Sequence, residues 1–77
     1  MKTITHFTDL NHESIQNLQK FVPTAQLKIL SEPNITHHDY ECEITIPASD
    51  EHLLGDFYCN DPIGFINGQY SYERIEN

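Results

Sequence analysis

Carboxylates recur at every second position in one short stretch of this 77-residue chain, at Asp39, Glu41 and Glu43. Alternate residues of a β-strand point to the same face and stand roughly 6.7 Å apart, which is twice the rise per residue. Three negative charges would therefore line one face of a strand at an even pitch. Such a row can receive the cationic groups of a partner, and its pitch resembles the repeat of phosphates along a nucleic-acid strand.

The row also has two interpretations that need no partner. An acidic strand can be an ordinary solvated face, or an edge strand whose charge protects it from aggregation. However, the chain from Ile29 to Glu73 contains nine acids and no lysine or arginine, whereas protein surfaces usually mix both signs. This one-signed composition keeps an acidic docking surface among the hypotheses.

Histidines and cysteines form a second group of reactive side chains, and all are potential metal ligands: His37, His38, Cys42, His52 and Cys59. Structural zinc sites usually contain close pairs such as Cys-x₂-Cys or His-x₃₋₅-His. His38 and Cys42 share strand parity, but no second close pair accompanies them. We therefore expect no metal and no cofactor, free thiols, and a buried position for Cys42 as a small hydrophobic residue.

Catalytic patterns are weak in this sequence. A Cys–His nucleophile pair is conceivable in any small chain with two cysteines and five histidines. General acid–base work by two carboxylates would require one of them in an apolar pocket. The chain has neither a glycine-rich phosphate loop nor an EF-hand calcium loop. We expect a protein that is not an enzyme.

The overall charge narrows the class of partner. Twelve acids and four bases give a net charge of −8. Direct binding to nucleic acid or to an anionic membrane surface relies on lysine and arginine and is not expected. A basic protein partner is favoured instead. No apolar run approaches the roughly 18 residues of a membrane span, and the N-terminus lacks the apolar segment of a secretory signal, so we expect a cytoplasmic protein.

The elements that would position these groups indicate a single α+β domain spanning residues 1–77. We predict a small, mainly antiparallel sheet of about four to five strands with one amphipathic helix, residues 11–22, packed on one face. Asn11 is the expected N-cap and Pro23 the expected end of this helix. Its expected apolar stripe consists of Ile15, Leu18, Phe21 and Val22.

The remaining segments supply the strands. Residues 1–8, 24–31 and 36–46 have β-type patterns, and Asn67-Gly68 indicates a hairpin that pairs Ile63 with Tyr72. A short second helical turn is predicted near residues 49–55, ended by Gly55. In the strand that contains the acidic row, the inward-facing residues should be Tyr40, Cys42, Ile44 and Ile46.

The candidate partner-binding surface extends beyond the row. Acids in the following segments could converge with it into one continuous negative face: Asp50, Glu51, Asp56 and Asp61. The bases would then gather on the helix side with Lys20. The tyrosines of this region are expected first of all to form the core face of the sheet, and Tyr58 and Tyr70 are the candidates for aromatic anchors within the acidic surface.

In size and charge, the chain resembles the broad class of phage-encoded anti-defence proteins, such as anti-CRISPR inhibitors and DNA mimics, and bacterial immunity proteins that cap toxic nucleases. No family motif can be placed on it residue by residue. The resemblance implies an inhibitor that sequesters a basic, nucleic-acid-handling partner. The alternative is an acidic structural or regulatory module of a larger assembly.

Overall fold

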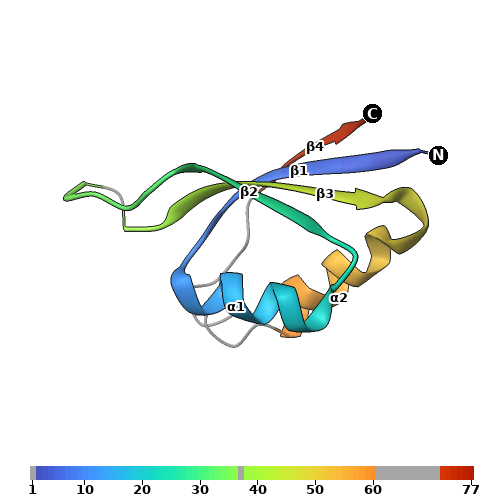
Figure 1. Ribbon diagram of the computed structural model, residues 1–77, viewed down its shortest axis with the longest axis horizontal. Coiled ribbons are helices and arrows are strands. Elements are labelled where there is room, and N and C mark those ends of the chain that lie inside the picture. The colour runs from blue at the N-terminus through green and yellow to red at the C-terminus, as the bar shows by residue number, and fades with distance from the viewer. Residues whose placement is uncertain (1, 37, 61–71) are drawn as a thin grey trace.

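Four strands, two α-helices and one 3₁₀ turn make up the computed structural model, which describes residues 2–36, 38–60 and 72–77 (Figure 1). The element order is β1 (Thr3–Leu10), α1 (His12–Phe21), β2 (Gln26–Ser31), β3 (Tyr40–Pro47), η1 (Ala48–Asp50), α2 (Glu51–Asn60) and β4 (Tyr72–Glu76). The strands form one antiparallel sheet in the order β2-β3-β1-β4. The predicted α+β class is therefore confirmed.

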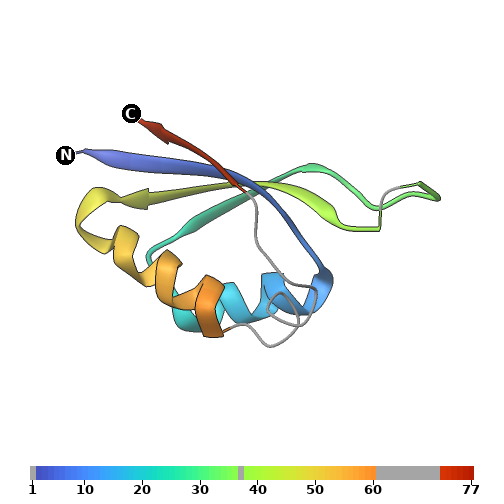
Figure 2. The ribbon, with the colours of Figure 1, turned by 180° about the vertical axis from the view of Figure 1, so that it is seen from behind.

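Both helices cover the same face of the sheet and leave the opposite face open (Figures 1 and 2). The alternation of β1 follows from this arrangement, because Ile4, His6 and Leu10 are buried while Asp9 is exposed. In register, His6 lies opposite Ile44 of β3 on one side and Arg74 of β4 on the other. β1 is thus one of the two interior strands of the sheet, beside β3.

The hydrophobic core lies between the sheet and the helices. It comprises Ile4, Leu10, Leu18, Val22, Cys42, Ile44, Ile46, Leu54 and Phe57. The predicted inward face of β3 is confirmed, because Cys42, Ile44 and Ile46 are at most 1% exposed and Tyr40 packs against the same cluster.

Helix α1 agrees with its prediction at both ends. The side chain of Asn11 accepts a hydrogen bond from the backbone N–H of Ser14 at 2.8 Å, which is the predicted N-cap. Phe21, however, is 57% exposed and does not belong to the buried stripe. The helix ends at Phe21, and the C-cap residue Val22, whose backbone has left the helical conformation, enters the core instead.

Helix α2 is longer than the predicted turn, because it continues through Gly55 to Asn60. Leu54 and Phe57, three residues apart, are buried on its inner side, and this burial outweighs the weak helix preference of glycine. The prediction that Gly55 ends the helix is therefore wrong.

Gly55→Ala should stabilise the protein by about 0.5–1 kcal/mol, because alanine loses less backbone freedom than glycine when it enters a helix. Gly55 is exposed, and an added Cβ would meet no atom within 4 Å. The urea midpoint of unfolding should rise accordingly. A lower midpoint would show that this position does not have ordinary helical geometry.

Strand boundaries differ from the predictions in two places that affect the acidic row. β1 continues to Leu10, and β3 begins only at Tyr40, so Asp39 precedes the strand. The predicted hairpin around Asn67-Gly68 and its pairing of Ile63 lie outside the described residues. Within the described ranges, no helix has the length and apolar character needed to cross a bilayer.

Candidate functional site

The charged side chains on the open face of the sheet lie on neighbouring strands, close to one another in register. Strand alternation and register bring four carboxylates to this face, together with one lysine: Asp9, Glu41, Glu43, Glu73 and Lys28. Two of these acids, Glu41 and Glu43, belong to the predicted row. We call this set, together with Phe7 and Leu30, the acidic face.

Phe7 stands at the centre of the acidic face. It is half-buried on β1, and its partners in register are Glu43 on β3 and Glu73 on β4. Two residues further along β1, Asp9 lies opposite Glu41 of β3. Directly opposed side chains have Cβ atoms about 4.5–5.5 Å apart, so an aromatic ring is flanked by a carboxylate on each side.

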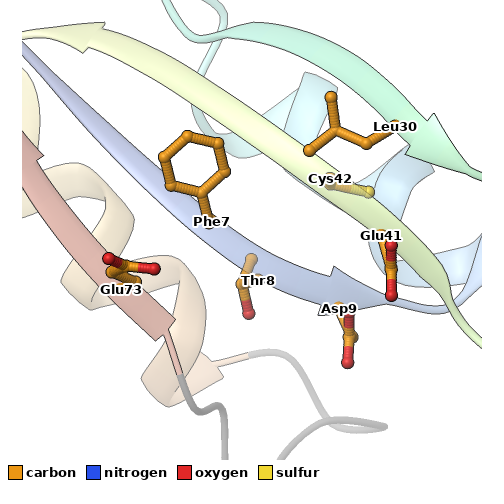
Figure 3. A pocket seen from close by; sticks show the side chains of 7 residues that line it. All are labelled: Phe7, Thr8, Asp9, Leu30, Glu41, Cys42 and Glu73. Carbon is orange, nitrogen blue, oxygen red and sulfur yellow. The ribbon is translucent and has the colours of Figure 1, made fainter.

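A shallow hollow of about 270 Å³ opens beside this ring (Figure 3). Three of the acids, Asp9, Glu41 and Glu73, line the hollow. The apolar side chains of Phe7 and Leu30 also line it, together with Thr8 and Cys42. Leu30 is 48% exposed at the place where β2 departs from regular pairing with β3. The hollow therefore combines an apolar wall with a negatively charged rim.

The structure does not bring all the predicted acids onto this face. Glu51 and Asp56 lie on α2, which covers the opposite side of the sheet. Asp50 lies in the η1 turn, where it accepts a hydrogen bond from Thr24. The expectation of one continuous negative face is wrong because the chain turns to the helix-covered side of the sheet after β3 ends at Pro47 (Figure 1).

The bases follow the prediction only in part, because Arg74 lies on the helix side and Lys28 does not. Lys28 lies on the open face, since its partner in register is Glu43. Arg74 points to the helix side, because its partner in register is the buried His6. Asp61 and Tyr70 lie outside the described residues, and their predicted roles stay predictions.

None of the family models, curated proteins or solved structures compared with this chain matches it. Its function must therefore be argued from its own side chains.

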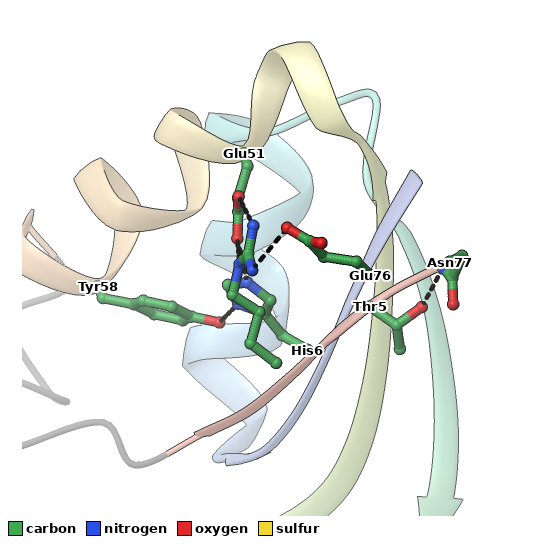
Figure 4. Close-up of polar contacts among 7 residues, drawn as sticks. Thr5, His6, Glu51, Tyr58, Glu76 and Asn77 are labelled. Atoms are coloured by element: carbon green, nitrogen blue, oxygen red, sulfur yellow. Dashed lines mark hydrogen bonds and ion pairs between the residues drawn. The ribbon is translucent and has the colours of Figure 1, made fainter. Parts of the chain in front are cut away.

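The sequence did not predict a cluster of polar side chains on the helix-covered side of the sheet (Figure 4). This cluster joins β1, α2 and β4. At its centre is His6, only 2% exposed. Its Nε2 lies 3.0 Å from Oε2 of Glu51, and its Nδ1 lies 2.8 Å from the hydroxyl of Tyr58. The ring of Tyr72 stacks on His6 with centroids 4.4 Å apart.

Arg74 completes this cluster from β4. Its guanidinium donates to both carboxylate oxygens of Glu51, with Nη2 2.9 Å from Oε1, and also to Glu76 at 3.1 Å. The hydrogen bonds from Arg74 and then from His6 lower the pKa of Glu51 from 4.5 to about 2. Glu51 raises the pKa of Arg74 in return.

The ionised carboxylate of Glu51 fixes the hydrogen-bonding roles of His6. A carboxylate only accepts, so Nε2–H of His6 donates to it. In the neutral ring, Nδ1 then accepts the hydroxyl hydrogen of Tyr58, whose own pKa is raised by burial. Both ring nitrogens are thereby occupied, and the cluster ties α2 and β4 to the middle of the sheet.

One feature of the sequence could have indicated this cluster, namely a histidine at an inward-facing position of a strand. His6 occupies a buried position in the alternation of Ile4, His6 and Leu10, and a buried imidazole requires hydrogen-bonding partners. The partners themselves come from segments 45 and 52 residues away, Glu51 and Tyr58. The predicted anchor Tyr58 therefore lies on the helix side and not on the acidic face.

The cysteines are both free, Cys42 buried and Cys59 exposed. Burial raises the pKa of the Cys42 thiol to about 11, as expected of an unreactive core residue. In the part of the chain that the structure describes, no three His, Cys, Asp or Glu residues are arranged to hold a metal ion. The expected absence of a metal stays a prediction, which metal analysis of the purified protein would test.

Proposed function

We propose that this protein binds a basic partner protein through its acidic face and thereby inhibits or sequesters that partner. One observation supports the proposal: four carboxylates from three neighbouring strands stand around Phe7 and Leu30, with Lys28 as the one base among these side chains. Protein–protein interfaces are enriched in aromatic residues near their centre and have a polar rim.

The charge of the acidic face suits recognition of lysine- and arginine-rich surfaces. Like charges that gather on a sheet repel each other, and a cationic partner relieves this repulsion. Long-range attraction of this kind accelerates association and weakens as salt is added. The protein's net charge of −8 adds to the attraction.

The proposed class of partner is a protein that handles nucleic acid, because such proteins carry basic surfaces that bind phosphates. Glu41 and Glu43 stand at the alternating pitch of β3, and Asp9 lies across from Glu41. In the proposed complex these carboxylates occupy positions that phosphates would otherwise take. Inhibition then results from competition and requires no catalytic step.

Two variants test the proposal, each of which loses two negative charges, one from the acidic face and the other from the helix side of the molecule. Glu41→Gln/Glu43→Gln removes two charges from the acidic face, and Glu13→Gln/Asp56→Asn removes two exposed charges from the helices. Fluorescence anisotropy would measure the binding of capped octa-lysine to each protein at low and high salt. A second series would measure how well each protein displaces single-stranded DNA from the peptide.

The acidic-face variant should bind octa-lysine about 5-fold more weakly than the wild type, because exposed ion pairs each contribute about 0.2–1 kcal/mol. It should also displace DNA less well. The helix variant should stay within about 2-fold of the wild type. Equal losses in both variants would show that only net charge matters, and the protein would then be better described as an acidic module of a larger assembly.

A further inference from the structure

We propose that the hollow beside Phe7 receives an arginine side chain of the basic partner. This inference rests on the proposed function and adds the chemistry of the recognised group. It starts from the two register pairs that place Glu43 on one side of Phe7 and Glu73 on the other. A cation over the ring would therefore meet the negative face of the aromatic system, and Glu73 is the flanking carboxylate that also lines the hollow.

The size of the hollow matches one long side chain. At about 270 Å³ it lies just below the roughly 300–1,000 Å³ of pockets for drug-sized ligands. It is open to solvent along the sheet, and its lining comes from β1, β2, β3 and β4 (Figure 3). A side chain that projects from a protein surface can enter it without displacing any element of the fold.

The two apolar walls favour arginine over lysine. Phe7 and Leu30 can cover the methylene stem of the incoming side chain. A guanidinium is planar and weakly hydrated, so it stacks on an aromatic ring at a lower cost in desolvation than an ammonium group. Its five N–H donors can also reach carboxylates in several directions at once.

The rim supplies acceptors in these directions. Glu73 comes from β4, Asp9 from β1 and Glu41 from β3, and all three line the hollow. The apolar walls count against a metal ion as the occupant, since hard cations are held by oxygen ligands on all sides. Arginine is also the residue that most often binds phosphate in a bidentate manner, so its capture would directly block a phosphate-binding surface.

The inference is tested with capped octa-arginine and octa-lysine, which carry equal charge. The wild type should bind octa-arginine about 3- to 5-fold more tightly, in line with about 0.5–1 kcal/mol for an exposed cation–π contact. Phe7→Leu should abolish this preference, because it should weaken octa-arginine binding about 3- to 5-fold and octa-lysine binding to a smaller extent. Phe7→Tyr, which keeps the ring, should retain the preference.

Phe21→Leu serves as the matched control, because Phe21 is an exposed aromatic residue on α1 at the helix side. It should leave the preference for octa-arginine unchanged. Circular dichroism would establish that each variant is folded. Equal affinity of the wild type for both peptides, or a preference that survives Phe7→Leu, would overturn the arginine inference. A different result would overturn the proposed function, namely an equal loss of octa-lysine affinity in the acidic-face variant and in the helix variant.

Discussion

Phe57→Ala should destabilise the protein by about 3–5 kcal/mol, the usual cost of truncating a buried phenylalanine. Phe57 is 1% exposed and is the largest fully buried side chain in the described core. A domain of this length has a total stability of only about 4–12 kcal/mol. The variant should therefore be largely unfolded well below the denaturant midpoint of the wild type, as measured by circular dichroism in urea.

The same substitution at Phe21 is the matched control. Phe21 is 57% exposed at the end of α1, and surface substitutions of this kind usually change stability by no more than about 0.5 kcal/mol. Similar losses at both positions would contradict the placement of α2 against the sheet.

Glu51→Ala should have the second largest effect, a loss of about 2 kcal/mol at pH 7, because it leaves the buried N–H of His6 without its acceptor. The partly exposed Arg74 would lose its main partner in the same step. Urea unfolding monitored by circular dichroism would measure the loss. Asp56→Ala removes an exposed carboxylate from the same helix and should have little effect.

The contribution of Glu51 should also depend on pH in a defined direction. Its pKa in the folded protein is about 2, below the ordinary value of 4.5. A lowered folded-state pKa gives stability that is complete above the unfolded-state value and is lost as the pH falls towards the folded-state value. The difference between the wild type and Glu51→Ala should therefore shrink from pH 5 towards pH 2. A difference that stays constant over this range would argue against ionisation of Glu51 as its source.

Local patterns in the sequence were sufficient to predict the fold class and one helix with its cap. The alternation in β3 identified its inward residues, because the period of a strand sorts side chains by face without further information. Asn11 identified the start of α1, since its side chain bonds within three residues of itself. Predictions of this kind depend on neighbours in the chain.

The errors arise where distant segments decide the outcome. We expected the acids of α2 to continue the acidic row, but the turn after Pro47 carries α2 to the other face of the sheet. Conversely, Asp9 and Glu73 join the acidic face only through pairing between β1, β3 and β4. Neither arrangement has a local signal, because contacts between segments far apart in the sequence decide which strands become neighbours.

The position of β1 between β3 and β4 has a consequence for the order in which the protein folds. Its contacts close large loops, since Thr5 meets Thr45 from 40 residues away and Asn77 from 72 residues away. β2 and β3, by contrast, pair within about ten residues at Ser31 and Glu41. Loop closure favours the nearer pair, so the β2–β3 hairpin should form early and β1 should enter the sheet later. In the native protein, the amide hydrogens of β1 should exchange with solvent only when the whole protein unfolds. The amide hydrogens of the edge strand β4 should exchange faster, through local opening of that strand.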